Sequence, residues 1–153
     1  MANTYTQLYY HVIFAVQGRT NLISSLWKTE LYKYISGTIA NKNQKLMCIN
    51  GVSDHVHILI GLKPDARLSD VVRDIKANSS RFINEKKWIK GKFEWQKGFG
   101  AFTVGYSQID QVINYINNQE SHHHTKSFSE EYIKFLNEAY IDYKHEYLFE
   151  AVT

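Results

Sequence analysis

The sequence has 153 residues, of which 44% are hydrophobic and 22% charged. This composition excludes a disordered chain and supports one globular domain over residues 1–153 with its own core. Cys48 is the single cysteine, so an internal disulfide is excluded. The longest apolar runs are too short to cross a bilayer, and the N-terminus lacks a basic start followed by an apolar run. We therefore expect a cytoplasmic protein.

The formal net charge is +3, and the charged residues are unevenly distributed along the sequence. The stretch from Lys63 to Lys97 holds ten lysines and arginines against five acidic residues, a balance of +5. From Glu120 to the end, three lysines face seven acidic residues, a balance of −4. A basic middle favours an anionic partner there, although a solvated helix face that carries lysines would give the same pattern.

The first half of the chain predicts three strands and a helix. Residues Leu8–Val16 are apolar on both faces, as is typical of a central strand. Ser24 or Ser25 is expected to cap a helix that ends near Asn41. Two further strands are expected, Lys45–Gly51 and His55–Leu62, and the three residues between them are short enough for an antiparallel hairpin.

The second half predicts a helix, a strand and two more helices. In chain order these are a helix Leu68–Lys87, a strand Phe93–Val104 bent at Gly98 and Gly100, a helix Gln108–Glu120 and a helix capped by Ser129. The order β-α-β-β-α-β followed by two helices indicates an α+β protein of the ferredoxin-like (RRM-like) type. We expect a four-stranded antiparallel sheet with helices on one face and the other face open to a ligand.

Two histidines stand two residues apart at the start of the third expected strand. His55 and His57 share one face with Leu59, while the apolar Val56 and Ile58 face the other side. This geometry can hold one metal ion between two neutral imidazoles. A His-x-His pair also occurs by chance in many sheets, so the pair alone is compatible with a metal site and with two histidines that bind no metal.

A tyrosine and an amide lie together on the helix Gln108–Glu120. Tyr115 and Gln119 are four residues apart, on one flank of the apolar stripe, so their side chains are neighbours. An ordinary surface tyrosine would give the same spacing.

These motifs together resemble a known family. They are, in chain order, Asp54-His55-Val56-His57, Arg73-Asp74-Ile75-Lys76 with Ser79-Ser80-Arg81, the run from Trp95 to Phe102, and the run from Tyr115 to His123. From about Leu8 to Lys126 the chain resembles the HUH single-tyrosine transposases, the TnpA proteins of the IS200/IS605 insertion sequences. On that likeness we expect an IS200-like transposase core at about 8–126 and a C-terminal helical tail at 127–153.

The resemblance implies a dimeric, metal-dependent endonuclease and strand transferase that acts on single-stranded DNA with hairpins at the element ends. Tyr115 matches the nucleophile, which would form a 5′-phosphotyrosine intermediate. His55, His57 and Gln119 match the ligands of Mg²⁺ or Mn²⁺. In this family, the tyrosine helix can complete the active site of the partner subunit.

Several assignments remain open at this stage. The stretch Lys76–Ser80 departs from the pattern of many relatives, which places the DNA contacts expected of Arg73, Lys76 and Arg81 in question. The run His122–His124 could be a second metal cluster, but we favour a structural or DNA-side role. Candidates for stacking on bases are Tyr9, Trp88, Trp95 and Phe99, of which Trp95 is expected in the core.

Two other functions fit parts of the pattern. One is a domesticated or inactive relative that binds hairpin DNA without cutting it. The other is a metal-dependent hydrolase of small phosphoesters, in which the basic helix and Tyr115 would be incidental.

Overall fold

The computed structural model describes residues 4–119 and 127–143, which form one antiparallel sheet with helices on both faces. The strands are β1 (Tyr9–Ala15), β2 (Lys45–Val52), β3 (His55–Gly61) and β4 (Gly100–Val104), in the spatial order β2-β3-β1-β4. Each neighbouring pair is antiparallel. The expected ferredoxin-like arrangement is confirmed, with β1 and β3 in the centre.

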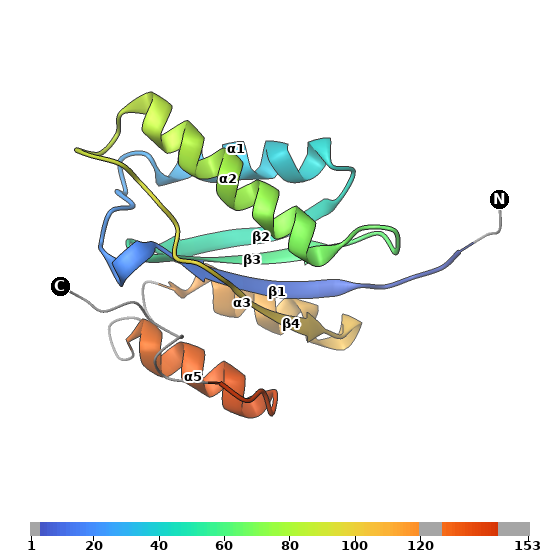
Figure 1. The fold of residues 1–153 in the computed structure, drawn as a ribbon. Coiled ribbons are helices and arrows are strands. Elements are labelled where there is room, and N and C mark those ends of the chain that lie inside the picture. Colours follow the sequence, from blue (N-terminus) through green and yellow to red (C-terminus); the bar gives the residue numbers. More distant parts are fainter. Residues whose placement is uncertain (1–3, 120–126, 144–153) are drawn as a thin grey trace.

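The helices lie in two layers (Figure 1). α1 (Lys28–Asn41) and α2 (Leu68–Lys86) cover one face of the sheet, while α3 (Ile109–Asn117) and α5 (Phe128–Glu138) lie on the other. The expectation of an open face is therefore wrong. Since α3 and α5 each carry an apolar stripe, they are stabilised by covering the second sheet face, which supplies apolar partners.

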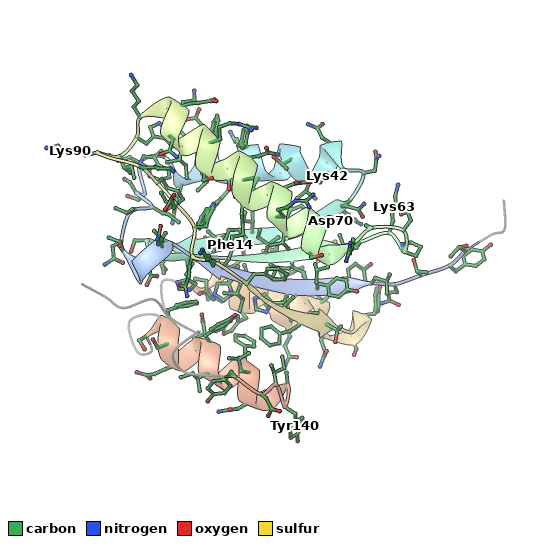
Figure 2. The ribbon with its side chains drawn as sticks, viewed as in Figure 1. Phe14, Lys42, Lys63, Asp70, Lys90 and Tyr140 are labelled. Carbon is green, nitrogen blue, oxygen red and sulfur yellow. The ribbon has the colours of Figure 1, made fainter. Side chains whose placement is uncertain are left out.

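The larger core lies between the sheet and the α1/α2 layer. Alternate residues of the central strands point into it, including Val12 and Phe14 of β1 and Val56 and Ile58 of β3. Phe14 lies between the sheet and α2 (Figure 2). This confirms which face of each strand was expected to be apolar, because residues two apart on a strand share a face.

The second sheet face carries two smaller apolar clusters. Leu59 packs with Ile109 and Ile116 of α3, and Ile13 packs with Phe128 of α5. His55 and His57 belong to this face, in register with β1 through the pairs Ala15 with His55 and Ile13 with His57. The histidines are thus enclosed between the sheet and the α3/α5 layer.

Some element boundaries differ from the expectations. The last strand is regular over Gly100–Val104 alone, because Trp95 makes an isolated bridge to Val16 and Gly98, with φ of 82°, turns the chain between them. α5 is capped by Ser127 and not by Ser129, since the Ser127 hydroxyl accepts a hydrogen bond from the Glu130 amide at 3.2 Å.

The N-terminal ends of α1 and α3 also lie later than expected. α1 begins at Lys28 after a turn in which the Leu26 amide bonds the Ser24 hydroxyl, and α3 follows the 3-10 turn η2 (Tyr106–Gln108). A second 3-10 turn, η1 (Gln17–Arg19), follows β1. None of the helices within residues 4–119 and 127–143 has the length and apolarity required to span a membrane.

Candidate active site between the sheet and the C-terminal helices

His55 and His57 are completely buried on β3, with ring centroids 5.0 Å apart. Both side chains point toward the layer of α3 and α5, since the alternating residues of β3 point toward α1 and α2. Phe128 of α5 stacks on His55 at 4.3 Å between centroids, so the helix closes the site from that side.

The Nδ1 atoms of His55 and His57 each lie within hydrogen-bonding distance of a neighbouring side chain. Nδ1 of His55 lies 2.7 Å from Oδ1 of Asp54, and Nδ1 of His57 lies 2.8 Å from Nε2 of His11. Burial above all, and then the nearby His57, lowers the pKa of His11 to about 3, so His11 is neutral. We assign the Nδ1 protons to His55 and His57, because a carboxylate and a neutral ring nitrogen then accept them. The Nε2 atoms of both rings are left facing the interior of the site.

Glu131 of α5 reaches the point on which those Nε2 atoms converge. Its Oε1 lies 3.0 Å from Nε2 of His57 and 3.4 Å from Nε2 of His55. Burial lowers the pKa of His55, but the hydrogen bonds that its ring donates to Asp54 and Glu131 outweigh it and leave that pKa raised. Ligand atoms of His55, His57 and Glu131 lie within 4.8 Å of one another, an arrangement that could hold a metal ion.

Tyr115 of α3 contacts the second oxygen of the Glu131 carboxylate. Its hydroxyl donates a hydrogen bond to Oε2 of Glu131, and its ring stands edge-on to His57 with centroids 5.9 Å apart. Burial, followed by the contact with Glu131, raises the pKa of Tyr115 above its ordinary value. The phenol is therefore protonated at neutral pH and points into the histidine site.

Gln119 lies two residues beyond the end of α3, which stops at Asn117 and not near Glu120 as expected, and it is completely buried. Its Nε2 donates to the Tyr115 carbonyl at 3.2 Å, and its side chain also hydrogen-bonds to Tyr115, which opposes the rise in the tyrosine pKa. The sequence left open whether the tyrosine helix completes its own site or that of a partner. In this structure, Tyr115 lies against His57 of its own chain.

Sequence reasoning missed Glu131 and His11 as members of the site. Glu131 shares a helical face with Phe128 and Phe135, and a carboxylate within an apolar stripe is a signal that could have been read. His11 is likewise a polar residue in an otherwise apolar strand. Neither signal identifies a partner, because Glu131 is 74 residues from His57 and His11 is 46 residues from it.

The expected DNA contacts Arg73, Lys76 and Arg81 belong to α2, on the opposite side of the sheet from the histidines. Lys76 is engaged within the fold, since its ammonium donates to the carbonyls of Gln96 at 2.7 Å and Gly98 at 2.8 Å. Arg73 and Arg81 are exposed, with 67% and 62% of their side-chain surfaces accessible.

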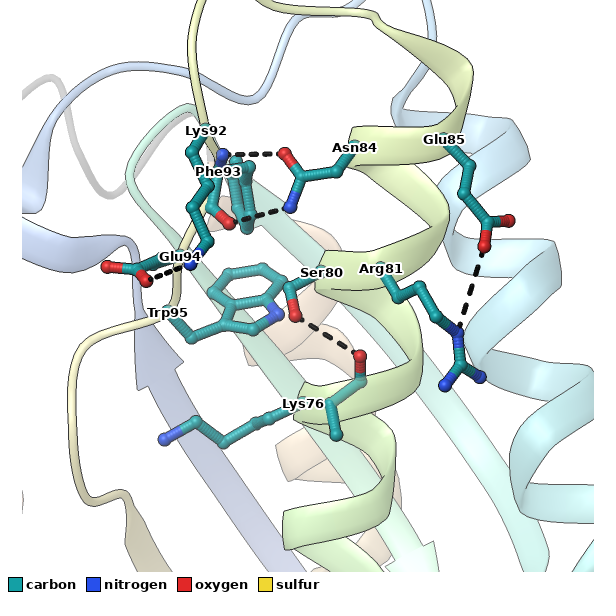
Figure 3. Close-up of a pocket in the computed structure, with 10 residues that line it drawn as sticks. Lys76, Ser80, Arg81, Asn84, Glu85, Lys92, Phe93, Glu94 and Trp95 are labelled. Carbon is teal, nitrogen blue, oxygen red and sulfur yellow. Dashed lines mark hydrogen bonds and ion pairs between the residues drawn. The ribbon is translucent and has the colours of Figure 1, made fainter.

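A shallow groove runs between α2 and the segment 92–95 (Figure 3). Its charges are compensated within the groove, because Arg81 lies 4.0 Å from Glu85 and Lys92 lies 3.1 Å from Glu94. Asn84 bonds both backbone groups of Phe93, which fixes the wall opposite α2. The groove therefore has no strong net charge that would attract a phosphate backbone.

The aromatic candidates for base stacking have different environments. Trp95 is buried as expected, and its Nε1 donates to the Ser79 hydroxyl at 2.9 Å. Trp88 stacks on Trp27 at 4.7 Å, whereas Phe99 is 36% exposed. Tyr9 is partly buried against the cluster around Leu59. The run His122–His124 lies outside the described residues.

Comparison with known proteins identifies the family. The family model described as "Transposase IS200 like" matches residues 4–119, more than half of the chain. The ISDra2 transposase TnpA of Deinococcus radiodurans is 26% identical over 120 residues, which cover 74% of this chain and 84% of that protein.

Two solved structures share the fold. A putative transposase from Deinococcus radiodurans R1 superposes with a TM-score of 0.63 at 23% identity, covering 78% of this chain and 95% of the other. A REP-associated tyrosine transposase, described as bound to a REP hairpin, gives a TM-score of 0.62 at 14% identity, covering 80% of this chain and 73% of the other. With the family match over residues 4–119, these findings establish that the chain belongs to the IS200-like transposase family.

Proposed function

We propose that this protein is a metal-dependent single-strand DNA endonuclease and strand transferase with Tyr115 as its nucleophile. The observation that carries the proposal is the convergence of the Tyr115 hydroxyl and the Nε2 atoms of His55 and His57 on one carboxylate. A phenol placed beside a candidate metal site suits attack on a phosphodiester. Membership of the transposase family supports the same reaction class.

The residues of the site fit a divalent cation. His55 and His57 have their Nδ1 atoms occupied and their Nε2 atoms directed at a common point, which is how metal-ligating histidines are usually held. Gln119 is the third ligand proposed from the family resemblance. Of Mg²⁺ and Mn²⁺, two imidazole donors favour Mn²⁺, since Mg²⁺ prefers oxygen ligands. A bound ion would polarise the scissile phosphate and offset the charge that develops on it.

Tyr115 would carry the covalent step. Its phenolic oxygen gives up its proton to water and forms a bond to phosphorus, and the bond from phosphorus to the 3′ oxygen breaks. The departing oxygen gains a proton and becomes a free 3′-hydroxyl, while the 5′ side stays linked to Tyr115. Since the link is still a phosphodiester, a second 3′-hydroxyl can attack it and join two strands without ATP.

Single-stranded DNA with hairpins at the element ends is the proposed substrate. A small pocket beside the site, between the segment 96–99 and α5, is lined by Lys97 and Phe99, which could hold a phosphate and a base. Arg73, Lys76 and Arg81 remain proposed DNA contacts, on a surface remote from Tyr115 where a hairpin stem could lie. The homologous fold described with a REP hairpin supports this substrate class.

We also propose a homodimer, on the family resemblance. Sedimentation equilibrium of the full chain tests it, because a monomeric mass throughout the concentration range used for activity would contradict it. Mixing a Tyr115→Phe chain with a His57→Ala chain then tests whether active sites are shared. Restored activity would show that the tyrosine of one chain serves the histidines of another.

Adduct formation tests the reaction itself. The full-length protein is incubated with single-stranded DNA from the ends of the element and Mn²⁺, and covalent protein–DNA adducts are separated on a denaturing gel. We expect an adduct with the wild type, a loss of it with Tyr115→Phe, and its retention with the matched control Tyr106→Phe, since Tyr106 is 75% exposed. An undiminished adduct with Tyr115→Phe would contradict the assignment.

The same experiment separates the alternatives. Tight binding of hairpin DNA with no adduct in either Mg²⁺ or Mn²⁺ would favour the relative that binds without cutting. Failure to bind single-stranded DNA at low salt, where phosphate contacts are strongest, would favour the hydrolase of small phosphoesters.

A further inference from the structure

Glu131 is a buried carboxylate on the face of α5 that packs against the sheet. Only 3% of its surface is exposed, and its helix neighbours Phe128, Tyr132 and Phe135 form the apolar contact with Ile13 and Ala15. A buried carboxylate is costly unless it is fully engaged. The apolar packing of α5 would be stronger with a hydrophobic residue at this position. Packing therefore does not explain why a carboxylate is present here.

The two oxygens of Glu131 face different partners. Oε1 lies 3.0 Å from Nε2 of His57 and 3.4 Å from Nε2 of His55, whereas Oε2 accepts the hydrogen bond from Tyr115. Neighbouring ligands bonded at about 2.1 Å to one cation are about 3.0 Å apart in an octahedron and about 3.4 Å apart in a tetrahedron. Both separations from Oε1 to the histidines fall in this range, and 3.0 Å is equally the length of a hydrogen bond between Oε1 and Nε2 of His57.

We propose that Glu131 is a catalytic residue of this transposase: Oε1 is an additional ligand of the metal held by His55 and His57, and Oε2 holds the Tyr115 hydroxyl beside it. This inference rests on the proposed function and adds a residue to its site. Glu131 lies beyond residues 4–119, so the family match does not cover it. One carboxylate thus fixes the distance between the metal and the nucleophile.

The proposed ligand set still leaves room for DNA. With His55, His57, Gln119 and Glu131 bound, an octahedral ion keeps two positions for phosphate oxygens or water. Carboxylate ligation also adds a charged oxygen donor to the amide oxygen of Gln119, and oxygen donors are those that Mg²⁺ and Mn²⁺ favour.

Metal binding by the full-length protein tests the proposal without DNA. Mn²⁺ is titrated into each protein, and the free ion is followed by electron paramagnetic resonance. We expect Glu131→Ala and Glu131→Gln to weaken Mn²⁺ binding at least tenfold and about fivefold, respectively, because a ligand or its charge is lost. The matched control is Glu130→Ala, which removes an exposed carboxylate from the same helix and should leave the affinity within twofold.

A crystal of the wild-type protein soaked in Mn²⁺ gives a second measurement that does not depend on a folded variant. Anomalous scattering should place the ion about 2.2 Å from Oε1 of Glu131. An ion bound to His55 and His57 with Glu131 turned away would overturn the proposal. An unchanged Mn²⁺ affinity in folded Glu131→Ala and Glu131→Gln would also overturn it. So would faster adduct formation by Glu131→Ala, because α5 would then block the active site and not contribute a ligand.

The outcomes distinguish this inference from the proposed function. If Glu131→Ala loses Mn²⁺ affinity and the wild type forms no adduct with DNA, the nuclease reaction is wrong while the ligand assignment stands. If the wild type forms the adduct and Glu131→Gln matches it in rate and in Mn²⁺ affinity, the reaction stands and the role of Glu131 is refuted.

Discussion

Nε2 of His11 lies 2.8 Å from Nδ1 of His57, across the central strand pair β1 and β3. His11 is 2% exposed and neutral, so it can accept the Nδ1 proton of His57 and hold that ring with its Nε2 toward Glu131. Asp54 does the same for His55 at 2.7 Å. In the proposed metal site His11 would therefore be a positioning residue, since it would act through the ring of His57.

Replacing His11 should weaken metal binding without removing a ligand. We expect His11→Phe, which keeps the volume but cannot accept a hydrogen bond, to reduce Mn²⁺ affinity by about 10- to 100-fold. His11→Gln keeps an acceptor at the corresponding position and should recover most of the affinity. Equal affinities for the two variants, measured on proteins with matching circular dichroism, would show that the hydrogen bond has no role in metal binding.

The pH dependence of stability should also report on His11. Its pKa is lowered from 6.5 to about 3 by burial first and by His57 second, so between these values the unfolded chain binds a proton that the folded chain does not. Stability attributable to this group is therefore present above pH 6.5 and falls as the pH drops toward about 3, by at most about 1.4 kcal/mol per pH unit.

Urea unfolding of the wild type and His11→Phe at several pH values within that window checks the sign. The wild type should lose stability faster than His11→Phe as the pH falls, since the variant has no proton to bind there. His55, whose pKa is raised, is present in both proteins, so the difference between the two curves reports His11 together with its contact to His57. Parallel curves for the two proteins would contradict the prediction.

Lys76 should matter for stability more than an exposed arginine on the same helix. Lys76→Met removes the hydrogen bonds to the carbonyls of Gln96 and Gly98, so we expect a loss of about 1–3 kcal/mol in the free energy of unfolding. Arg73→Met is the matched control and should change stability by less than about 0.5 kcal/mol, because Arg73 is 67% exposed.

DNA binding by the same two variants separates structural from contact roles. If Lys76 contacts DNA as proposed, folded Lys76→Met should bind hairpin DNA more weakly than the wild type in fluorescence anisotropy. An unchanged affinity would assign Lys76 a structural role alone.

Substitutions at two glycines should change the stability of the protein in opposite directions. A Cβ at Gly51 would overlap the backbone carbonyl of His55 across the β2–β3 hairpin, and backbone cannot yield as a side chain does. We expect Gly51→Ala to destabilise the protein by more than about 2 kcal/mol and to displace the strand that carries His55.

Gly37 has open space around its Cβ position and lies inside α1, so Gly37→Ala should stabilise by about 0.5–1 kcal/mol. Thermal denaturation of both variants tests the pair. An unchanged melting temperature for Gly51→Ala would contradict the close approach at the hairpin.

Local patterns in the sequence were enough to predict the four strands, their antiparallel arrangement, and the pairing of His55 with His57 and of Tyr115 with Gln119. Alternation in β1 and β3 identified the face that carries His55 and His57, because the period of a strand is two residues. The spacing of Tyr115 and Gln119 predicted that they are neighbours, and Gln119 does bond the Tyr115 carbonyl, although α3 ends at Asn117. These signals are local, so they can be read without knowledge of contacts elsewhere in the chain.

The folded structure was needed to show what covers the second sheet face and which groups meet beneath it. The apolar stripes of α3 and α5 show that these helices need a partner, but not which surface they will cover. Docking of α5 brings Glu131 to His57 across 74 residues, and pairing of β1 with β3 brings His11 to the same ring. Hydrogen bonds between groups so far apart do not produce any periodicity in the sequence. The contacts of His11 and Glu131 with His57 could therefore be identified only in the folded structure.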